Sequence, residues 1–452
     1  MTSDVTIQPP AVGWPARPIA TSGLARATRV ALGLPDDRVV VMSGHQAQLW
    51  HAGIAAKAFA TAHLAHSGGG VSAWISVDQD ATDACAIAYP TVAMRTATWR
   101  LDAGSAGAAQ RTELPAIGLR EAAKVFSPMP TDMHASVRAA ADAVLSTLRK
   151  HADRPTMAAQ FNAAAFEPLA GLAEMDVQRG AMTLSRTPIF ESVLALMRAD
   201  PLACAQRYNA AVAGVPAARM RPLLVHGTRV ELPLWRVRPG LSRSPVFAHD
   251  LATLPRDQLA PRALLMTAML RAAACDVFIH GVGGGVYDQA TDVWWRAWLA
   301  DASGAACQPL RELTLAPTAV VTATRRLHFP GVHVPTPAEI DASVWRAHRA
   351  RHDVSALGPA ASTRKRELLD AIAQASRRSP QRRGLYRELH GLIAQARERG
   401  ASMIVEAREA AQVALQSREI AQTAHARTWP CAFLPRAMLE ELCYSIGRAL
   451  NR

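Results

Sequence analysis

The stretch VVVMSGHQAQLWHAGIAAKAF, residues 39–59, begins as an apolar run, reaches Ser43-Gly44 and continues into an alanine-rich segment. A second apolar run, VSAWISV at residues 71–77, ends at Asp78. Between the two runs, residues 54–65 have the composition of a helix, which stops at HSGGG. Strand, helix and strand within about 40 residues is the spacing of a βαβ unit with parallel strands. The sequence therefore predicts an α/β fold built on a parallel sheet.

The loops after these two strands would open on the same edge of the sheet, where open α/β sheets bind ligands. We expect the first strand to end at residue 42 and Ser43 and Gly44 to make a turn, so that His45 and Gln46 face this edge. A helix N-terminus at this edge would attract a phosphate or carboxylate, and Lys57 would add positive charge. The alternative is that His45 is an ordinary polar cap.

The second loop begins with Asp78-Gln79-Asp80. Carboxylates at the end of a buried strand are unfavourable unless they bind a cation, an amine or a hydroxyl, or cap a helix. We expect Asp78 and Asp80 to bind substrate, and Asp80, like His45, is a candidate general base. Capping of a following helix is the alternative.

A third candidate segment is FIHGVGGGVYDQATD, residues 278–292. The sequence predicts a strand ending at His280, a glycine loop, and then a helix that carries Tyr287 and Asp288. Glycines such as Gly283 and Gly284 let a backbone approach a polar ligand closely. The spacing is neither that of a Walker loop nor Gly-x-Gly-x-x-Gly, so the motif is weak by itself. The alternative for the aspartates is a capped, solvated first turn.

In the rest of the chain, the amino-acid composition changes from one segment to the next. We expect residues 1–114 and 216–335 to form the two parts of the α/β core and residues 115–215 to form a helical insertion. Residues 336–428 are rich in Ala, Arg, Glu and Gln, which predicts an antiparallel helical hairpin or coiled coil. Residues 429–452 are apolar again and are expected to pack back on the core.

The bulk composition limits the classes of function. The formal charge is +13, but only four of the 50 basic residues are lysine and the arginines are dispersed, which argues against nucleic acid as a partner. Six scattered cysteines without a C-x-x-C pair argue against a zinc ribbon or a disulfide framework. No histidine motif predicts a metal site. No apolar run is long enough to cross a membrane, and the N-terminus has no signal core, so we expect a cytoplasmic protein without a membrane partner.

The order of these motifs resembles that of the bacillithiol synthase family, the cysteine-adding enzymes of bacillithiol biosynthesis. The resemblance rests on SGHQAQLWHAGIAAKAF, SAWISVDQDATD, the block around FIHGVGGGVYDQATD, and the C-terminal RTWPCAFLPRAMLEEL. His45 stands where the family has the first glutamine of Thr-Gly-Gln-Gln; Gln46 matches the second, and Lys57 matches the helix lysine. The glycine loop lacks the family's Pro-Gly-Glu, which identifies the chain as a divergent member.

The resemblance implies a Rossmann-like core with a helical insertion, followed by a C-terminal antiparallel coiled coil that supports a homodimer. It implies a ligase that joins cysteine, or a similar amino acid, to the amine of an amino-sugar conjugate, with small-molecule substrates and ATP as a candidate cofactor. His45 and Asp80 are then the catalytic residues. The expected substrate-binding residues are Ser43, Gly44, Gln46, Lys57, Asp78, His280, Gly283, Gly284, Tyr287 and Asp288. Two alternatives remain: a nucleotide-binding or nucleotidyl-transferring enzyme on the same edge, or a non-catalytic coiled-coil scaffold.

Overall fold

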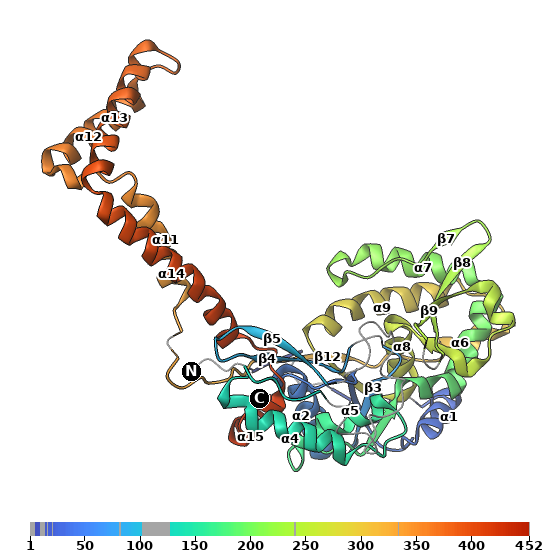
Figure 1. Ribbon diagram of the computed structural model, residues 1–452. Helices are drawn as coiled ribbons and strands as arrows, with labels where there is room; N and C mark the ends of the chain where they lie inside the picture. Colours follow the sequence, from blue (N-terminus) through green and yellow to red (C-terminus); the bar gives the residue numbers. More distant parts are fainter. Residues whose placement is uncertain are drawn as a thin grey trace. The chain divides into compact units, whose positions relative to one another are not determined.

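The computed structural model describes residues 5–9, 14–15, 17–19, 21–80, 83–101, 127–238, 241–332 and 334–451. The chain divides into two compact units (Figure 1). The first, here called the core unit, comprises Met1–Tyr89, Ala97–Leu327 and Arg427–Arg452. The second, the helical unit, comprises Pro90–Thr96 and His328–Ala426. The predicted boundary between residues 114 and 115 lies outside the described residues.

The core unit is built on a six-stranded sheet. From one edge to the other, its strands are β1 (Val5–Gln8), β12 (Thr318–Ala323), β11 (Val277–His280), β2 (Val40–Gln46), β3 (Val71–Val77) and β6 (Val177–Gly180). β1 is antiparallel to β12, and the other neighbouring strands are all parallel to each other. The prediction of an α/β fold with a mostly parallel sheet is therefore confirmed.

The order of the strands reverses between β2 and β11. From β2 the chain passes through α2 (Ala52–Ser67) to β3, and β6 follows beyond β3. From β11 it passes through α9 (Val282–Asp301) to β12. β11 and β12 thus lie on one side of β2, and β3 and β6 lie on the other. Connections that leave two adjacent parallel strands in opposite directions open a crevice at the carboxyl ends of those strands, which is where such sheets bind ligands.

The two faces of the sheet are buried against different helices. α2 packs across β2, β3, β11 and β12, and on this face Trp74 of β3 packs against Trp50 and Phe166. Successive residues of a strand point to opposite faces. The next residue, Ile75, accordingly belongs to a large apolar cluster that includes residues of α1 (Gly23–Leu32), α6 (Pro188–Ala199), α8 (Ala263–Met269) and α9. A sheet covered on both sides explains why its central strands read as apolar runs.

Two buried polar contacts join β2 to its neighbourhood. Next to the amino end of β11, the Asp276 carboxylate accepts hydrogen bonds from the Val40 amide at 2.8 Å and the Ile19 amide at 2.7 Å, and it pairs with Arg29 at 2.8 Å. Farther along β2, the Ser43 hydroxyl donates to the Ile279 carbonyl at 2.7 Å. Ser43 is therefore a link between β2 and β11 inside the sheet, and these contacts hold together the two strands between which the order reverses.

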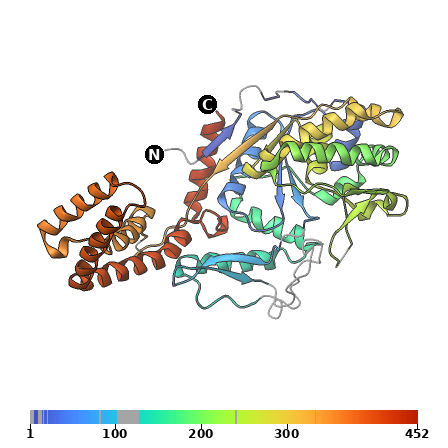
Figure 2. The same ribbon diagram turned by 90° about the horizontal axis from the view of Figure 1, so that it is seen from above.

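The remaining elements of the core unit lie outside this sheet or at its margins. A small sheet pairs β8 with β7, β9 and β10, and α15 packs on α2 and β1 (Figure 2). The bounds are β4 Ala86–Pro90, β5 Thr96–Arg100, α4 Ala135–Lys150, α5 Met157–Phe166, α7 Pro201–Gly214, β7 Val225–His226, β8 Arg229–Arg236, β9 Ser244–Phe247, β10 Leu259–Pro261, a π-helix at Leu270–Ala274, α10 Gln308–Arg311 and α15 Arg436–Leu450.

The helical unit contains α11 (Pro337–Ala350), α12 (Pro359–Gln374), α13 (Pro380–Arg399) and α14 (Ala401–His425). α11 packs along α14, and α12 packs on α13 around an apolar cluster that includes Leu368 and Ile393. The composition of residues 336–428 predicted helices, and all regular elements described between residues 334 and 426 are helical. Among the described residues of the whole chain, no helix is both long and apolar enough to cross a membrane.

Two local predictions were wrong. β2 does not end at residue 42 but continues to Gln46, because His45 and Gln46 pair with residues of β3. Ser43 and Gly44 are therefore strand residues, and Gly44 is needed because a Cβ there would lie 2.4 Å from the Ile75 carbonyl oxygen. The predicted glycine loop after β11 is instead the first turn of α9. The segment 115–215 also contains β6, which the sequence did not predict.

Candidate functional site

A cavity of about 990 Å³ lies within the core unit, where β2 and β11 end and α2 and α9 begin. It opens at the point where the strand order reverses. Segments that are far apart in the sequence meet here, including the ends of β3 and β12. The lining includes nine of the twelve predicted site residues: Gly44, His45, Gln46, Lys57, Asp80, His280, Gly283, Gly284 and Tyr287.

Lys57 is the buried cation of the cavity. It lies on α2, its side chain is only 4% exposed, and its amino group donates a short hydrogen bond to the Gly44 carbonyl. The amino nitrogen also lies 5.4 Å from the centre of the Trp74 ring. No carboxylate among the described residues pairs with it, and burial lowers the pKa of Lys57 to about 7. An anion entering the cavity would therefore bind a cation that has no opposite charge beside it.

The charge of Lys57 acts on two histidines, His45 near the end of β2 and His51 at the N-cap of α2. Burial, then the charges of Lys57 and His51, hold the pKa of His45 well below its usual value. Burial, then Arg427 and Lys57, lower the pKa of His51. The Nδ1 of His51 accepts the Gly53 amide at 3.1 Å and so caps α2, which leaves the proton of the neutral ring on Nε2. Both rings are therefore neutral at neutral pH, and each has a nitrogen that can exchange a proton.

The first turn of α9 contributes unpaired backbone amides to the cavity. Its N-cap is Gly281, no side chain caps the helix, and no acidic residue lies in its first turn. The first backbone bond of the helix is from the Gly285 amide to the Gly281 carbonyl, so the amides of residues 282–284 have no partner within the helix. With Lys57 close to Gly281, this helix end has the charge distribution that binds anions.

His280 is held in place from behind the cavity. Its Nε2 lies 3.3 Å from the Asp288 carboxylate, which in turn pairs with Arg271 at 2.8 Å. All three side chains are at most 4% exposed, and Arg271 lies in the π-helix at Leu270–Ala274. Burial is the main reason why the pKa of His280 is lowered. Asp288 therefore does not line the cavity but orients a residue that does, and the Tyr287 ring packs edge-on against His280.

The two aspartates after β3 lie in different surroundings. Asp78 does not line the cavity: its carboxylate accepts the Met182 amide at 2.9 Å, and burial raises its pKa to about 6. Asp80 lines the cavity and pairs with Arg243 at 3.0 Å. Of the predicted site residues, Ser43, Asp78 and Asp288 are thus the three outside the lining.

Sequence reasoning missed an arginine-rich part of the lining. Arg262 and Arg243 lie on the Trp235 ring, at 3.8 Å and 4.6 Å from its centre. Arg262 also pairs with the buried Glu231, at 2.6 Å, and Arg221 forms a second ion pair with Glu231. Trp235 and Glu231 lie on β8, Arg262 is the N-cap of α8, and no motif distinguished these residues. A fourth, Arg427, comes from the C-terminal segment of the core unit.

The charge of the lining indicates the kind of ligand. Five lysine and arginine side chains line the cavity, whereas Asp80 is the one acidic side chain among the described lining residues. Because the cavity is also partly enclosed, these charges are less screened than charges on an open surface. The arrangement favours a ligand with at least one negative charge.

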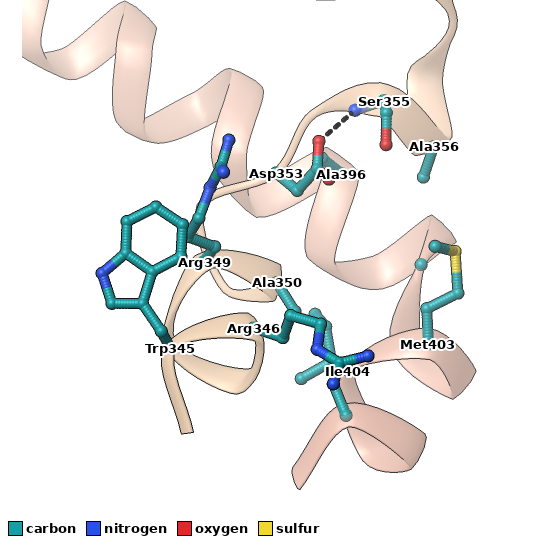
Figure 3. Close-up of a pocket in the computed structure, with 12 residues that line it drawn as sticks. Trp345, Arg346, Arg349, Ala350, Asp353, Ser355, Ala356, Ala396, Met403 and Ile404 are labelled. Atoms are coloured by element: carbon teal, nitrogen blue, oxygen red, sulfur yellow. Dashed lines mark hydrogen bonds between the residues drawn. The ribbon is translucent and has the colours of Figure 1, made fainter. Parts of the chain in front are cut away.

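A second cavity, of about 460 Å³, lies within the helical unit between α11, α13 and α14 (Figure 3). The ring of Trp345 lies beside Arg349, whose guanidinium is 4.6 Å from the ring centre, and Asp353 bonds the Ser355 amide. None of the described polar side-chain atoms of this cavity is both buried and unpaired. It therefore lacks the buried, uncompensated charge that characterises the core cavity.

Among the described residues, no group of three or more His, Cys, Asp or Glu side chains is arranged to hold a metal ion. The absence of a metal cofactor remains a prediction. No protein-family model matches the chain, and no curated protein matches it either. The assignment of function therefore rests on the cavity itself.

Proposed function

We propose that the chain is a carbon–nitrogen ligase similar to the bacillithiol synthases, which joins cysteine or a similar amino acid to the amine of an amino-sugar conjugate. The observation that carries this proposal is Lys57, a buried cation without a carboxylate partner among the described residues, on the wall of a cavity where the strand order reverses. Amide formation passes through an oxyanion, and a fixed cation beside free backbone amides stabilises such a charge.

The lining also offers candidates for the proton transfer. The attacking amine must lose a proton, and His45 is neutral at neutral pH, so its ring can accept one. Asp80 is the weaker candidate, because its carboxylate is engaged in an ion pair with Arg243. We therefore assign the general base to His45, whereas Asp80 positions Arg243.

The finer description of the fold belongs to the same proposal. The strand order β6-β3-β2-β11-β12 supports a Rossmann-like core. The antiparallel pairing of α11 with α14 supports a coiled coil, and exposed apolar residues on these helices, such as Trp345 and Val413, support a homodimer through the helical unit.

The proposed reaction is tested with the purified chain, cysteine, ATP and glucosaminyl malate. Mass spectrometry should detect the amide product with the wild-type chain. His45→Ala should reduce the rate by about 100-fold or more, the usual contribution of a general base. Ser417→Ala, a substitution on α14 outside the cavity, is the control and should leave the rate unchanged. Absence of product across a range of amino acids and amino sugars would contradict the proposal.

A second function is favoured by one specific feature. The uncapped, glycine-rich first turn of α9 suits a phosphate group as well as a carboxylate. The chain would then be a nucleotide-binding or nucleotidyl-transferring enzyme, with ATP bound at the same edge of the sheet. Calorimetric titration of ATP separates the two: binding of ATP without formation of any amide product would favour this second function.

A further inference from the structure

We propose that His280 is a second proton acceptor of the core cavity, and that Asp288, held by Arg271, is the positioning residue that fixes the protonation of its ring. The inference rests on the proposed function, because it completes the proton transfer that amide formation requires. An amine that binds in its ammonium form has three protons on nitrogen, whereas the amide nitrogen keeps one. Two protons are therefore removed in each reaction, and His45 accounts for one of them.

The two proton transfers belong to one balanced reaction. Loss of the first proton gives the nitrogen the lone pair that forms the bond to the acyl carbon of the amino acid. The second proton leaves the nitrogen when the acyl carbon releases its leaving group together with the bonding electron pair. That leaving group comes from activation of the carboxyl group by a nucleoside triphosphate, the candidate cofactor. His45 and His280 each take one proton and later pass it to water.

The surroundings of His280 decide which nitrogen of its ring carries the proton. Nε2 is buried and lies 3.3 Å from the Asp288 carboxylate. A neutral imidazole carries its proton on the nitrogen that faces a carboxylate, because two lone pairs at this distance would repel each other. The proton therefore lies on Nε2, and Nδ1 has the lone pair that can accept another proton.

Nδ1 lies against the first turn of α9, on the side of the ring that faces lining residues. A Cβ at Gly284 would be 2.4 Å from Nδ1, so glycine at this position leaves the nitrogen uncovered. His280, Gly283 and Gly284 all line the cavity, whereas Asp288 does not. The ring also packs against two aromatic rings, but Nδ1 has no hydrogen-bond partner among the described residues. The unprotonated nitrogen is thus the one directed towards a ligand.

Arg271 keeps the Asp288 carboxylate ionised and in place. Its guanidinium pairs with Asp288 at 2.8 Å and also with Asp292, and its Nε donates to the Ala316 carbonyl at 2.8 Å. Arg271 lies in the π-helix, a rare geometry that is frequent at functional sites. Burial by itself would raise the pKa of Asp288, but His280 and Arg271 hold that pKa below its usual value. The ionised carboxylate stabilises the imidazolium that forms when Nδ1 takes a proton.

Burial and the neighbouring charges act on His280 in opposite directions. Burial is the main effect that lowers the pKa of His280, and the charges of Lys57 and Arg271 add to it, whereas Asp288 opposes them. The Tyr287 ring packs edge-on against the imidazole. Because the pKa of His280 lies below its usual value, the ring is neutral at neutral pH. The imidazolium formed by proton transfer then returns its proton to water.

The protonation of His280 is measured by NMR on the full chain with isotope-labelled histidine rings. The signals of His280 are identified by their loss in His280→Gln, or in His280→Asn if the first variant does not fold. At neutral pH the wild-type ring should carry its proton on Nε2 and none on Nδ1. Asp288→Asn keeps the shape of the side chain but removes its charge, so it should lower the pKa of His280.

The rate of amide formation gives the second measurement. His280→Gln should lower kcat by about 100-fold, the usual contribution of a proton acceptor, and change KM less than about twofold. Asp288→Asn should lower kcat by about tenfold or more, since the imidazolium loses its stabilising charge. Asp301→Asn is the matched control, because it removes a paired, exposed carboxylate from the other end of α9. It should leave both kcat and the pKa of His280 unchanged.

Three results overturn the inference: a wild-type ring with its proton on Nδ1, an Asp288→Asn variant in which the pKa of His280 is unchanged or raised, or a His280→Gln variant that forms product at the wild-type rate. In the last case the ligase stands and His280 only lines its cavity. If no amine yields product but the ring has the expected protonation and the expected response to Asp288→Asn, the reaction is wrong and the pair of Asp288 and His280 stands.

Discussion

Lys57 is buried on α2, although its amino group makes one hydrogen bond, to a backbone oxygen, and one ring contact, to an indole. An ammonium group has three donors, so this environment suits the neutral amine better than the cation. Burial lowers the pKa of Lys57 from 10.5 to about 7, because it disfavours the charged form. A lysine that faces a cavity and whose charge is unfavourable in the folded state is a candidate ligand-binding residue.

The first prediction concerns stability. Between pH 7 and 10.5 the unfolded chain holds the Lys57 proton more tightly than the folded chain, so the stability contributed by this residue rises with pH across that range. Below pH 7 Lys57 is charged in both the folded and the unfolded chain, so the whole of its unfavourable effect on the free energy of unfolding is present. Lys57→Met should therefore be more stable than wild type at pH 7, by a few kcal/mol, and should lack this rise.

Urea unfolding of both proteins at neutral and alkaline pH measures the difference. Lys150→Met is the control, since Lys150 is exposed and paired with Glu167. It should be no more stable than wild type at either pH. A Lys57→Met variant that is less stable than wild type at neutral pH would show that the folded protein stabilises the ammonium group.

The second prediction concerns anion binding at the same residue. An anion beside Lys57 favours the charged amine, so binding should raise the pKa of Lys57 and take up a proton near pH 7. Affinity for an anionic substrate such as glucosaminyl malate should then fall as the pH rises above about 7. Calorimetry in two buffers with different ionisation enthalpies measures the proton uptake. Equal heats in both buffers at pH 7 to 8 would contradict the prediction.

At the scale of the element, the first turn of α9 shows why glycines follow β11. A Cβ at Gly284 would lie 2.4 Å from Nδ1 of His280, and one at Gly285 would lie 2.3 Å from Val320. A Cβ at Gly283 would meet nothing within 4 Å. Two of the three glycines therefore allow close packing of the helix on the sheet, and the third is not required by packing.

This difference gives the third prediction. Gly284→Ala should destabilise the protein by about 1–3 kcal/mol, because the buried His280 ring has to move. It should also weaken ligand binding. Gly283→Ala is a matched control one residue away and should be neutral or slightly stabilising, by less than about 1 kcal/mol. Thermal unfolding of the two variants tests the contrast, and equal effects would show that contact with His280 is not the reason for glycine at position 284.

The same scale shows what the sequence could predict. The bounds of β3 were predicted correctly because its apolar run is flanked by HSGGG and by aspartates. The end of β2 was missed because its last residues are polar but still pair with β3. β6 was missed because Val177–Gly180 is a short edge strand without a buried residue, so it has no apolar signal.

At the scale of the whole molecule, the position of some cavity residues could be predicted from the sequence and that of others could not. His45 and His280, which line the cavity, were selected because they lie at strand ends, and Lys57, which also lines it, because it is the one lysine of the helix that follows β2. Asp78 and Asp288 share that sequence context, but one accepts a backbone amide and the other holds His280, which only the packed structure shows. The position of Arg427 in the lining could not be predicted, since it depends on the return of the C-terminal segment to the core unit.

The fourth prediction concerns assembly through the helical unit. If exposed apolar side chains of α14 form a homodimer contact, Val413→Glu should convert the dimer into a monomer by placing a charge in that contact. Val413 is 61% exposed. Val30→Glu on α1, at a residue that is 70% exposed, is the control and should leave the mass unchanged. Light scattering after size-exclusion chromatography measures both, and a monomeric wild type would contradict the prediction.

The bridge between His51 and Pro430 also has a consequence during synthesis. The ribosome completes β2, α2, β11 and α9 long before residues 427–431 emerge, so the nascent chain can form the sheet while one side of its cavity is still missing. The cavity is therefore complete only after residues 427–431 have been synthesised and have packed against the start of α2. A polypeptide that is released before this segment is made would lack that part of the cavity wall.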